Sequence, residues 1–222
     1  MDQKNNKKIM DIDLKEFYVF LNIHEKSGSI TNNNFSYGFA ATALIELFLM
    51  DKIKLENAKI VVSSYKKIDD PILERIRKAI NDAGKTRKVA PWLFRISMKV
   101  PKFKKQVLKN LERKRIIKIE YRKFLRLIPY KRYTIKNRQL RKSLINQITE
   151  VAYGSSPFNE VLNHYAVVYS SGIIPMVFKS QMRKEAVKRF EEIMEKERAN
   201  QQLWELTRSL RKIIKRNSRE QV

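Results

Sequence analysis

The sequence contains no cysteine, and this absence removes several classes of protein at once. Without thiols the chain has no disulfide framework, no thiolate metal site and no cysteine nucleophile. Its first 13 residues are polar and lack the apolar run of a signal peptide. We therefore expect a cytoplasmic protein.

Glycine and histidine are scarce, and those present form no known catalytic motif. The five glycines make neither a phosphate loop nor a dinucleotide fingerprint, and His24 and His164 stand apart from any HExxH motif. Glu46 is the one candidate catalytic acid, but in so basic a chain it is interpreted as half of a structural ion pair. We therefore expect no metal, no cofactor and no enzymatic activity.

Long hydrophobic runs are also absent. The most apolar stretch, residues 39–50, is far shorter than the roughly 20 residues that are needed to span a bilayer. It is interpreted as a buried core helix, because 43% of the residues are apolar and can form an ordinary core. Any contact with a membrane is therefore expected to be peripheral.

Positive charge is what the sequence has in excess. Lysine and arginine number 48 against 23 acids, which gives a formal net charge of +25. Residues 99–142 carry 18 of these cations and only two acids. Such self-repulsion indicates a polyanionic partner, although charge alone does not distinguish a nucleic acid, an anionic membrane surface or an acidic protein.

Helical periodicity dominates the chain, so the predicted fold is mainly α: a compact helical bundle around a buried central helix, with two β-hairpins. The first hairpin is expected at 53–62. One domain is expected over 13–216, with a disordered lead at 1–12 and a tail at 217–222. The predicted helices are 14–21, 34–50, 71–83, 92–98, 101–115, 138–153 and 157–215, the last with a break at Gly172 and Pro175.

The second hairpin is predicted from extended patterns at 116–121 and 124–128. Pro129 argues against a central strand, so this hairpin is expected to project from the body. Aromatic residues alternate with its cations, an arrangement that suits a membrane interface, stacked bases or packing within the hairpin. These aromatic residues are Tyr121, Phe124, Tyr130 and Tyr133.

Several segments, in their order and spacing, resemble the Golgi phosphoprotein 3 type (GPP34) family over about residues 14–196. The clearest is SYGFAATALIELFLMDKIKL from Ser36, which resembles the family's central helix and the hairpin after it. Further similar segments are DDPILERI at Asp69, the helix around Trp92, VLKNLERKRIIKIE at Val107 and FLRLIPYKRYTI at Phe124. The resemblance implies a mostly helical, non-catalytic fold with a projecting hairpin.

The resemblance also implies peripheral binding of a phosphoinositide headgroup, specifically phosphatidylinositol 4-phosphate. In eukaryotic members it further implies contact with the cytoplasmic tails of glycosyltransferases, and self-association through the hairpin. Thr31, Ala40 and Pro101 replace a Trp and two Arg of the eukaryotic headgroup site, and Lys104 replaces a third Arg. Because Lys lacks the bidentate fork of Arg, a less selective surface for anionic lipid is expected.

The sequence thus predicts a peripheral membrane-associating protein that binds anionic phospholipid headgroups through a basic helix and hairpin. The expected partners are anionic lipid, cytoplasmic tails of membrane proteins and a second copy of the chain. The alternative is a nucleic-acid-binding protein, because a helix followed by a basic hairpin also describes a winged helix. The candidate headgroup-binding residues are Lys102, Lys104, Lys105, Arg126, Lys131 and Arg132.

Overall fold

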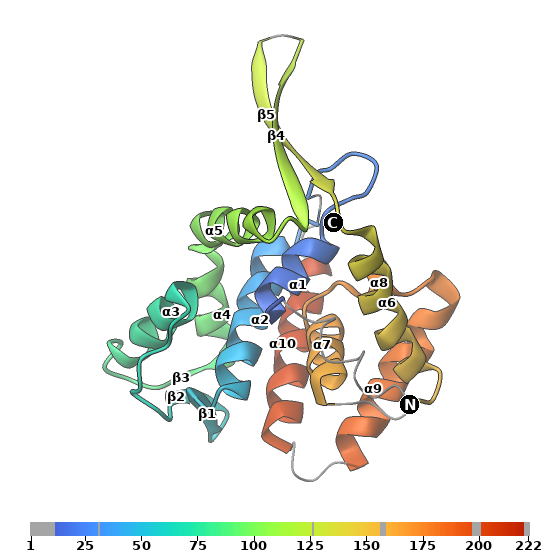
Figure 1. The fold of residues 1–222 in the computed structure, drawn as a ribbon. Helices are drawn as coiled ribbons and strands as arrows, with labels where there is room; N and C mark the ends of the chain where they lie inside the picture. The colour runs from blue at the N-terminus through green and yellow to red at the C-terminus, as the bar shows by residue number, and fades with distance from the viewer. Residues whose placement is uncertain (1–11, 31, 126, 156–158, 197–200, 220–222) are drawn as a thin grey trace, which may run out of the picture.

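The computed structural model describes residues 12–30, 32–125, 127–155, 159–196 and 201–219, and it is mainly helical as predicted (Figure 1). Helix α2 (Phe35–Leu49) is the predicted central helix, and its residues from Gly38 to Leu47 are buried. Apolar side chains occupy nearly every side of α2, so neighbouring helices must cover it all round. Those neighbours are α1 (Leu14–Leu21), α4 (Val89–Ser97), α5 (Val100–Arg113), α7 (Asn159–Ser170) and α10 (Gln201–Arg219).

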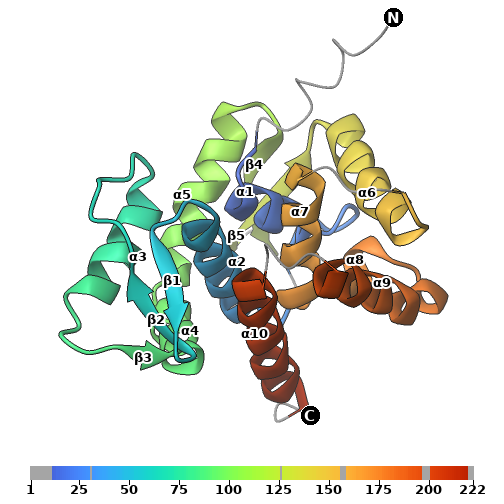
Figure 2. The ribbon, with the colours of Figure 1, turned by 90° about the horizontal axis from the view of Figure 1, so that it is seen from below.

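The remaining elements flank this centre on two sides (Figure 2). On one side lie α3 (Pro71–Asn81) and a small antiparallel sheet of β1 (Ile53–Glu56), β2 (Lys59–Val62) and β3 (Arg87–Lys88). On the other side lie α6 (Arg138–Ala152), α8 (Ile174–Val177), the 3-10 helix Ser180–Met182 and α9 (Arg183–Lys196).

The first hairpin is confirmed, with Ile53 paired to Val62 across β1 and β2. Its turn residues Asn57 and Ala58 have φ of 50° and 59°, as the tight turns that match the twist of paired strands require. The third strand, β3, escaped prediction because it is two residues long and shows no alternation.

The ends of the chain bear on the expected domain limits. Within the expected lead 1–12 the structure describes only Ile12, which is buried, and residues 1–11 lie outside the described part. At the other end, α10 continues to Arg219, three residues past the expected limit at 216. A reason is visible at Ser218, whose hydroxyl accepts a hydrogen bond from the Asn34 side-chain amide at 2.5 Å.

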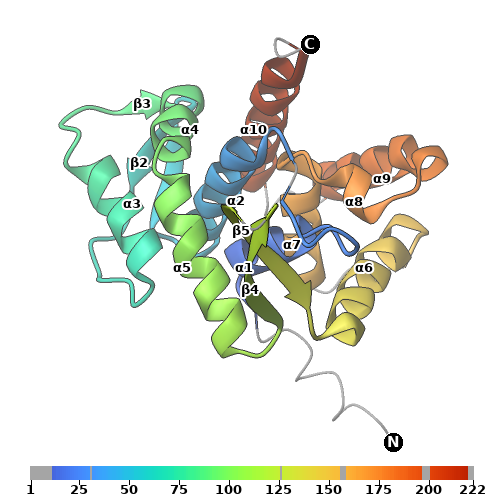
Figure 3. The same cartoon turned by 90° about the horizontal axis from the view of Figure 1, so that it is seen from above.

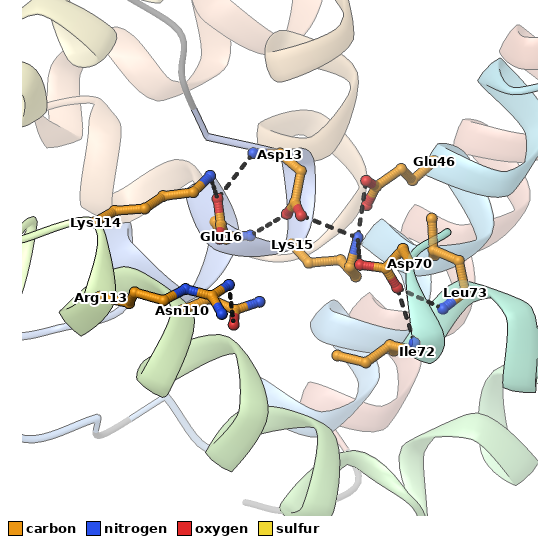
Figure 4. A network of polar contacts seen from close by, with 10 residues as sticks. All are labelled: Asp13, Lys15, Glu16, Glu46, Asp70, Ile72, Leu73, Asn110, Arg113 and Lys114. Carbon is orange, nitrogen blue, oxygen red and sulfur yellow. Dashed lines mark hydrogen bonds and ion pairs between the residues drawn. The ribbon is translucent and has the colours of Figure 1, made fainter. Parts of the chain in front are cut away.

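A buried cluster of charged groups fastens α1 to α2 and α3 (Figure 4). The side chain of Lys15 is only 1% exposed, and its Nζ lies 2.8 Å from Glu46 Oε1. Asp13 and Asp70, which cap α1 and α3, each place a carboxylate oxygen 3.4 Å from the same nitrogen. The interpretation of Glu46 as part of a structural ion pair is thereby confirmed.

The next residue of α1 extends this network to the end of α5. Glu16 is buried, and its Oε2 accepts a hydrogen bond from Lys114 Nζ at 2.7 Å (Figure 4). Lys114 directly follows α5 and precedes the second hairpin. The position of the basic helix relative to the core therefore depends on α1.

The second hairpin consists of β4 (Ile117–Phe124) and β5 (Ile128–Ile135), and it projects from the helical body as predicted (Figure 1). The expected strand at 124–128 is wrong, because Phe124 ends β4 and Leu125, with φ of 48°, lies in the turn. Pro129 lies within β5, opposite Lys123. A two-stranded hairpin tolerates this proline, since each strand has a free edge and needs no second hydrogen-bonded neighbour.

Glu46 provides a test of the buried cluster. Burial raises the pKa of the Glu46 carboxyl to about 7, against the lowering effect of Lys15 and with a further rise from Asp13 and Asp70. Between the unfolded pKa of about 4.3 and this value, the folded state binds a proton that the unfolded state does not. Relative to Glu46→Gln, the wild-type protein should therefore gain stability as the pH falls from 8 to 5.

The measurement is urea denaturation of both proteins at several pH values. The matched control is Glu150→Gln, which changes an exposed carboxylate on α6. Each variant's free energy of unfolding is subtracted from that of the wild type at each pH. If the difference for Glu46→Gln changes with pH in the same way as the difference for Glu150→Gln, Glu46 does not titrate as a buried acid.

Gly38 provides a test of the packing around α2. A Cβ at this position would collide with the Tyr18 Oη atom of α1 and the Ser171 carbonyl oxygen after α7. Gly38→Ala should therefore force these helices apart and lower the free energy of unfolding by about 1–3 kcal/mol. Thermal denaturation measures the change, with Ser36→Ala on the same helix as the control, and an equal effect of both variants would contradict this account.

Candidate anion-binding groove

One face of α5 is turned toward the second hairpin. Residues three and four apart lie on the same side of a helix, and the buried residues of α5 follow this spacing along the core. A neighbouring stripe, in which only Leu108 is buried, carries three lysines and Glu112. The core-facing residues are Val100, Phe103, Val107 and Leu111, and those facing the hairpin are Pro101, Lys104, Lys105, Leu108, Lys109 and Glu112.

The hairpin presents alternate side chains to this stripe. Successive residues of a strand point to opposite faces, and Ile119 pairs with Tyr133 while Tyr121 pairs with Lys131. These four residues form the face toward α5. Figure 3 looks along the hairpin and shows β4 and β5 above α1 with α5 beside them.

A groove of about 230 Å³ separates these two faces, and we call it the lysine groove. Its cations are Lys104, Lys105, Lys109 and Lys131. Within the described residues, none of these four lysines forms an ion pair with a carboxylate. The one acid of the groove, Glu112, accepts a hydrogen bond from the Ile119 backbone N–H at 2.8 Å.

Aromatic rings hold two of these lysines in place. The Nζ of Lys104 lies 5.5 Å from the centre of the Phe35 ring, and the Nζ of Lys131 lies 5.2 Å from that of Tyr121. Cation–π contacts of this length attract the ammonium group without neutralising its charge. The groove is therefore a concave site with positive charge available to an anion.

The structure brings three of the six predicted site residues together. Lys104, Lys105 and Lys131 line the lysine groove. Lys102 is exposed on α5 but does not line it, and Arg132 lies on the other face of the hairpin, where its guanidinium donates to the Lys26 carbonyl oxygen at 3.0 Å. Arg126 lies outside the described residues.

Lys109 lines the groove but is not among the predicted site residues. The signal was present, because Lys109 follows Lys105 by four residues and so occupies the same side of α5. Tyr121 and Tyr133, two of the aromatic residues that alternate with the cations of the hairpin, both line the groove. Tyr130 is exposed and does not line it, and the Phe124 side chain lies outside the described part.

The basic run 99–142 does not form one surface. Arg141 is buried and donates to the Phe20 and Leu21 carbonyl oxygens at the end of α1, at 2.7 and 3.1 Å. Arg122 binds Glu120 at 2.8 Å on the exposed strand face. Counting charges along the sequence therefore overstates the size of the basic patch.

The four positions that correspond to the eukaryotic headgroup site do not all lie at the groove. Pro101 and Lys104 both line the lysine groove. Ala40 is fully buried in α2, and Thr31 lies outside the described residues. Two of the four positions thus meet at the groove, and only one of these carries a charge.

The two histidines do not come together. His24 is exposed, whereas His164 is buried, with its ring edge-on to Phe17 and its Nδ1 2.7 Å from the Glu160 carbonyl oxygen. Burial lowers the pKa of His164. In the described part of the chain, no group of histidines and carboxylates is arranged to hold a metal ion.

Among the described helices, none has the length and the apolar composition that crossing a bilayer demands. No curated protein matches the sequence. The model of the Golgi phosphoprotein 3 (GPP34) family matches residues 14–215. Because this match covers nearly the whole chain, the protein belongs to the Golgi phosphoprotein 3 (GPP34) family, a Golgi-associated family, and its membership is consistent with a lipid- or protein-binding role.

Proposed function

We propose that this protein binds, without catalysis, to the cytoplasmic face of a membrane and holds anionic phospholipid headgroups in the lysine groove. The observation that carries the proposal is the convergence of four lysines, none with a carboxylate partner among the described residues, on one concave site. Phosphates are the natural ligands of such a site, because several point charges can surround their oxygens.

The composition of the hairpin tip favours a membrane over a free anion as the ligand. Leu125 and Leu127 are 74% and 82% exposed, and Ile128 beside them is also exposed. Apolar side chains gathered at a projecting tip favour transfer out of water, and a bilayer accepts them. Lys131 lies three residues from Ile128, about 10 Å along a strand. With Ile128 in the acyl layer, Lys131 would therefore lie at the outer edge of a headgroup layer of about 5–8 Å.

Estimates of the binding free energy show why both the lysines and the apolar tip are needed. A basic residue near an anionic leaflet contributes about 1 kcal/mol, so four lysines supply about 4 kcal/mol, which corresponds to only about millimolar affinity. Burying the apolar tip adds about 1.5–3 kcal/mol for each large side chain. We therefore propose that the lysines hold the headgroups while the tip enters the acyl layer.

Headgroup selectivity is proposed to be low. Phosphatidylinositol 4-phosphate is the headgroup that the family resemblance suggests, but the groove offers lysines rather than the bidentate guanidinium of arginine. Lysine ammonium groups adapt to many phosphate geometries, so charge density should matter more than headgroup shape. Tails of membrane proteins and a second copy of the chain remain predicted partners.

The first test reverses charge in the lysine groove. Lys105→Glu combined with Lys109→Glu should weaken sedimentation with phosphatidylserine liposomes at least tenfold, because two attractions become repulsions. The control, Lys66→Glu combined with Lys67→Glu, makes the same change of net charge at exposed positions between β2 and α3. The assay includes liposomes with and without phosphatidylinositol 4-phosphate, two salt concentrations and duplex DNA as competitor.

Equal losses in both double variants would contradict a specific groove. Tight binding of duplex DNA without binding to liposomes would instead favour the winged-helix alternative. Strict dependence on phosphatidylinositol 4-phosphate would contradict the proposed low selectivity while leaving membrane binding intact.

The second test concerns the hairpin tip. Leu125→Ser combined with Leu127→Ser should abolish the liposome binding that persists at high salt, because hydrophobic insertion is not screened by ions. Tyr153→Ser, at an exposed aromatic residue after α6, is the control and should leave this binding unchanged. Unaltered salt-resistant binding in the tip variant would show that the tip stays outside the bilayer.

A further inference from the structure

A second groove lies between α3, α4 and the beginning of α5, and we call it the α3–α4 groove. It encloses about 260 Å³, and its floor includes Ile76, Trp92 and Phe103. None of the residues that line it is acidic. It shares no lining residue with the lysine groove and does not depend on the function proposed for that site.

The outer face of α4 is apolar where a surface helix is ordinarily polar. Trp92, Leu93 and Ile96 of α4 are buried against the core. Phe94 and Met98 are nevertheless 55% and 69% exposed, and both border the groove. They are four residues apart, so they stand together on one side of the helix. Exposed apolar side chains beside a recess are a feature of docking sites.

Three cations surround this apolar recess, namely Arg75, Arg95 and Lys99. In the described part of the chain, none of the three forms an ion pair with a carboxylate. The Arg95 guanidinium lies 5.7 Å from the centre of the Trp92 ring. Elsewhere on α3, Glu74 neutralises Arg77 at 2.9 Å, so the positive rim is not a general property of this helix.

From this combination we infer that the α3–α4 groove docks an acidic amphipathic peptide segment of a partner protein. Its apolar side chains enter the recess beside Phe94 and Met98, and its carboxylates meet the surrounding cations. The volume suits this occupant, because small-molecule pockets typically measure about 300–1,000 Å³ and this recess fits one or two large side chains.

Charge disfavours two other occupants of the α3–α4 groove. A second copy of the chain carries a net charge of +25 and is repelled by a basic rim. The chain's own residues 1–11 contain three lysines against two aspartates and are a poor match for the same reason. Contact of this face with a membrane is the remaining alternative, and the liposome measurement below tests it.

The position of the groove leaves the hairpin accessible. α3 and α4 lie to one side of the helical body, whereas the hairpin projects above it (Figure 1). Helix α5 begins at the α3–α4 groove and runs to the base of the hairpin (Figure 3). A partner segment docked here therefore does not cover the lysine groove.

The test is selection of random 12-residue peptides on phage against the full chain, followed by fluorescence polarisation with synthetic copies of the enriched peptides. Enriched sequences should combine an aromatic or leucine anchor with Asp or Glu within one helical turn. Their amide versions, with Asn and Gln in place of the acids, should bind at least tenfold more weakly.

Two protein variants locate the binding. Arg95→Glu with Lys99→Glu should weaken it at least tenfold through charge, and Phe94→Ser with Met98→Ser should do so through lost apolar contact. The latter residues are exposed, so the fold should persist, as circular dichroism will verify. The double variant Lys66→Glu with Lys67→Glu serves as the charge control and should bind as the wild type does.

Three results would overturn the inference. One is a selection that yields no acidic and apolar consensus. Another is a set of peptides that bind the groove variants as tightly as the wild type. The third is a Phe94→Ser with Met98→Ser variant that loses liposome binding as the hairpin-tip variant does, since this face would then contact a membrane.

Discussion

Two adjacent charged side chains of α1, Lys15 and Glu16, connect the parts of the molecule on which the lysine groove depends. Lys15 joins α1 to α2 and to the beginning of α3 through three carboxylates. Glu16 holds Lys114, where α5 gives way to the hairpin. Removing one partner of a buried ion pair is costly, because the remaining charge is left in a medium of low polarity. This network therefore positions α5, and with it one wall of the groove.

The same network helps to explain why the surface is so basic. Several of the 23 acids are engaged in structural contacts, as Asp13, Glu46 and Asp70 are around Lys15. Acids used in this way do not neutralise cations at the surface. Within the described part of the chain, unpaired cations line two grooves of different chemistry. The lysine groove combines ammonium groups with tyrosines, whereas the α3–α4 groove combines cations with exposed apolar side chains.

The sequence predicts most helices, the first hairpin and the projection of the second hairpin. These features depend on local interactions, such as apolar periodicity and the start of α3 at Asp70 and Pro71. The sequence does not predict the limits of β5, because Pro129 and aromatic residues on both faces obscure the alternation of apolar and polar residues. The lysine groove was predicted in part. Sequence spacing places Lys105 and Lys109 on one side of α5, but only the strand register shows that Lys131 faces them and Arg132 does not. The α3–α4 groove depends on tertiary packing that no local pattern reveals.

The central claim is that the hairpin enters an anionic membrane, and the absence of cysteine allows a direct measurement. Leu127→Cys and Tyr65→Cys each introduce a single thiol at an exposed site, which can carry a fluorophore sensitive to polarity. On adding phosphatidylserine liposomes, the account predicts a blue shift for the label at position 127 and none at position 65. Binding to the liposomes without a shift at position 127 would contradict it.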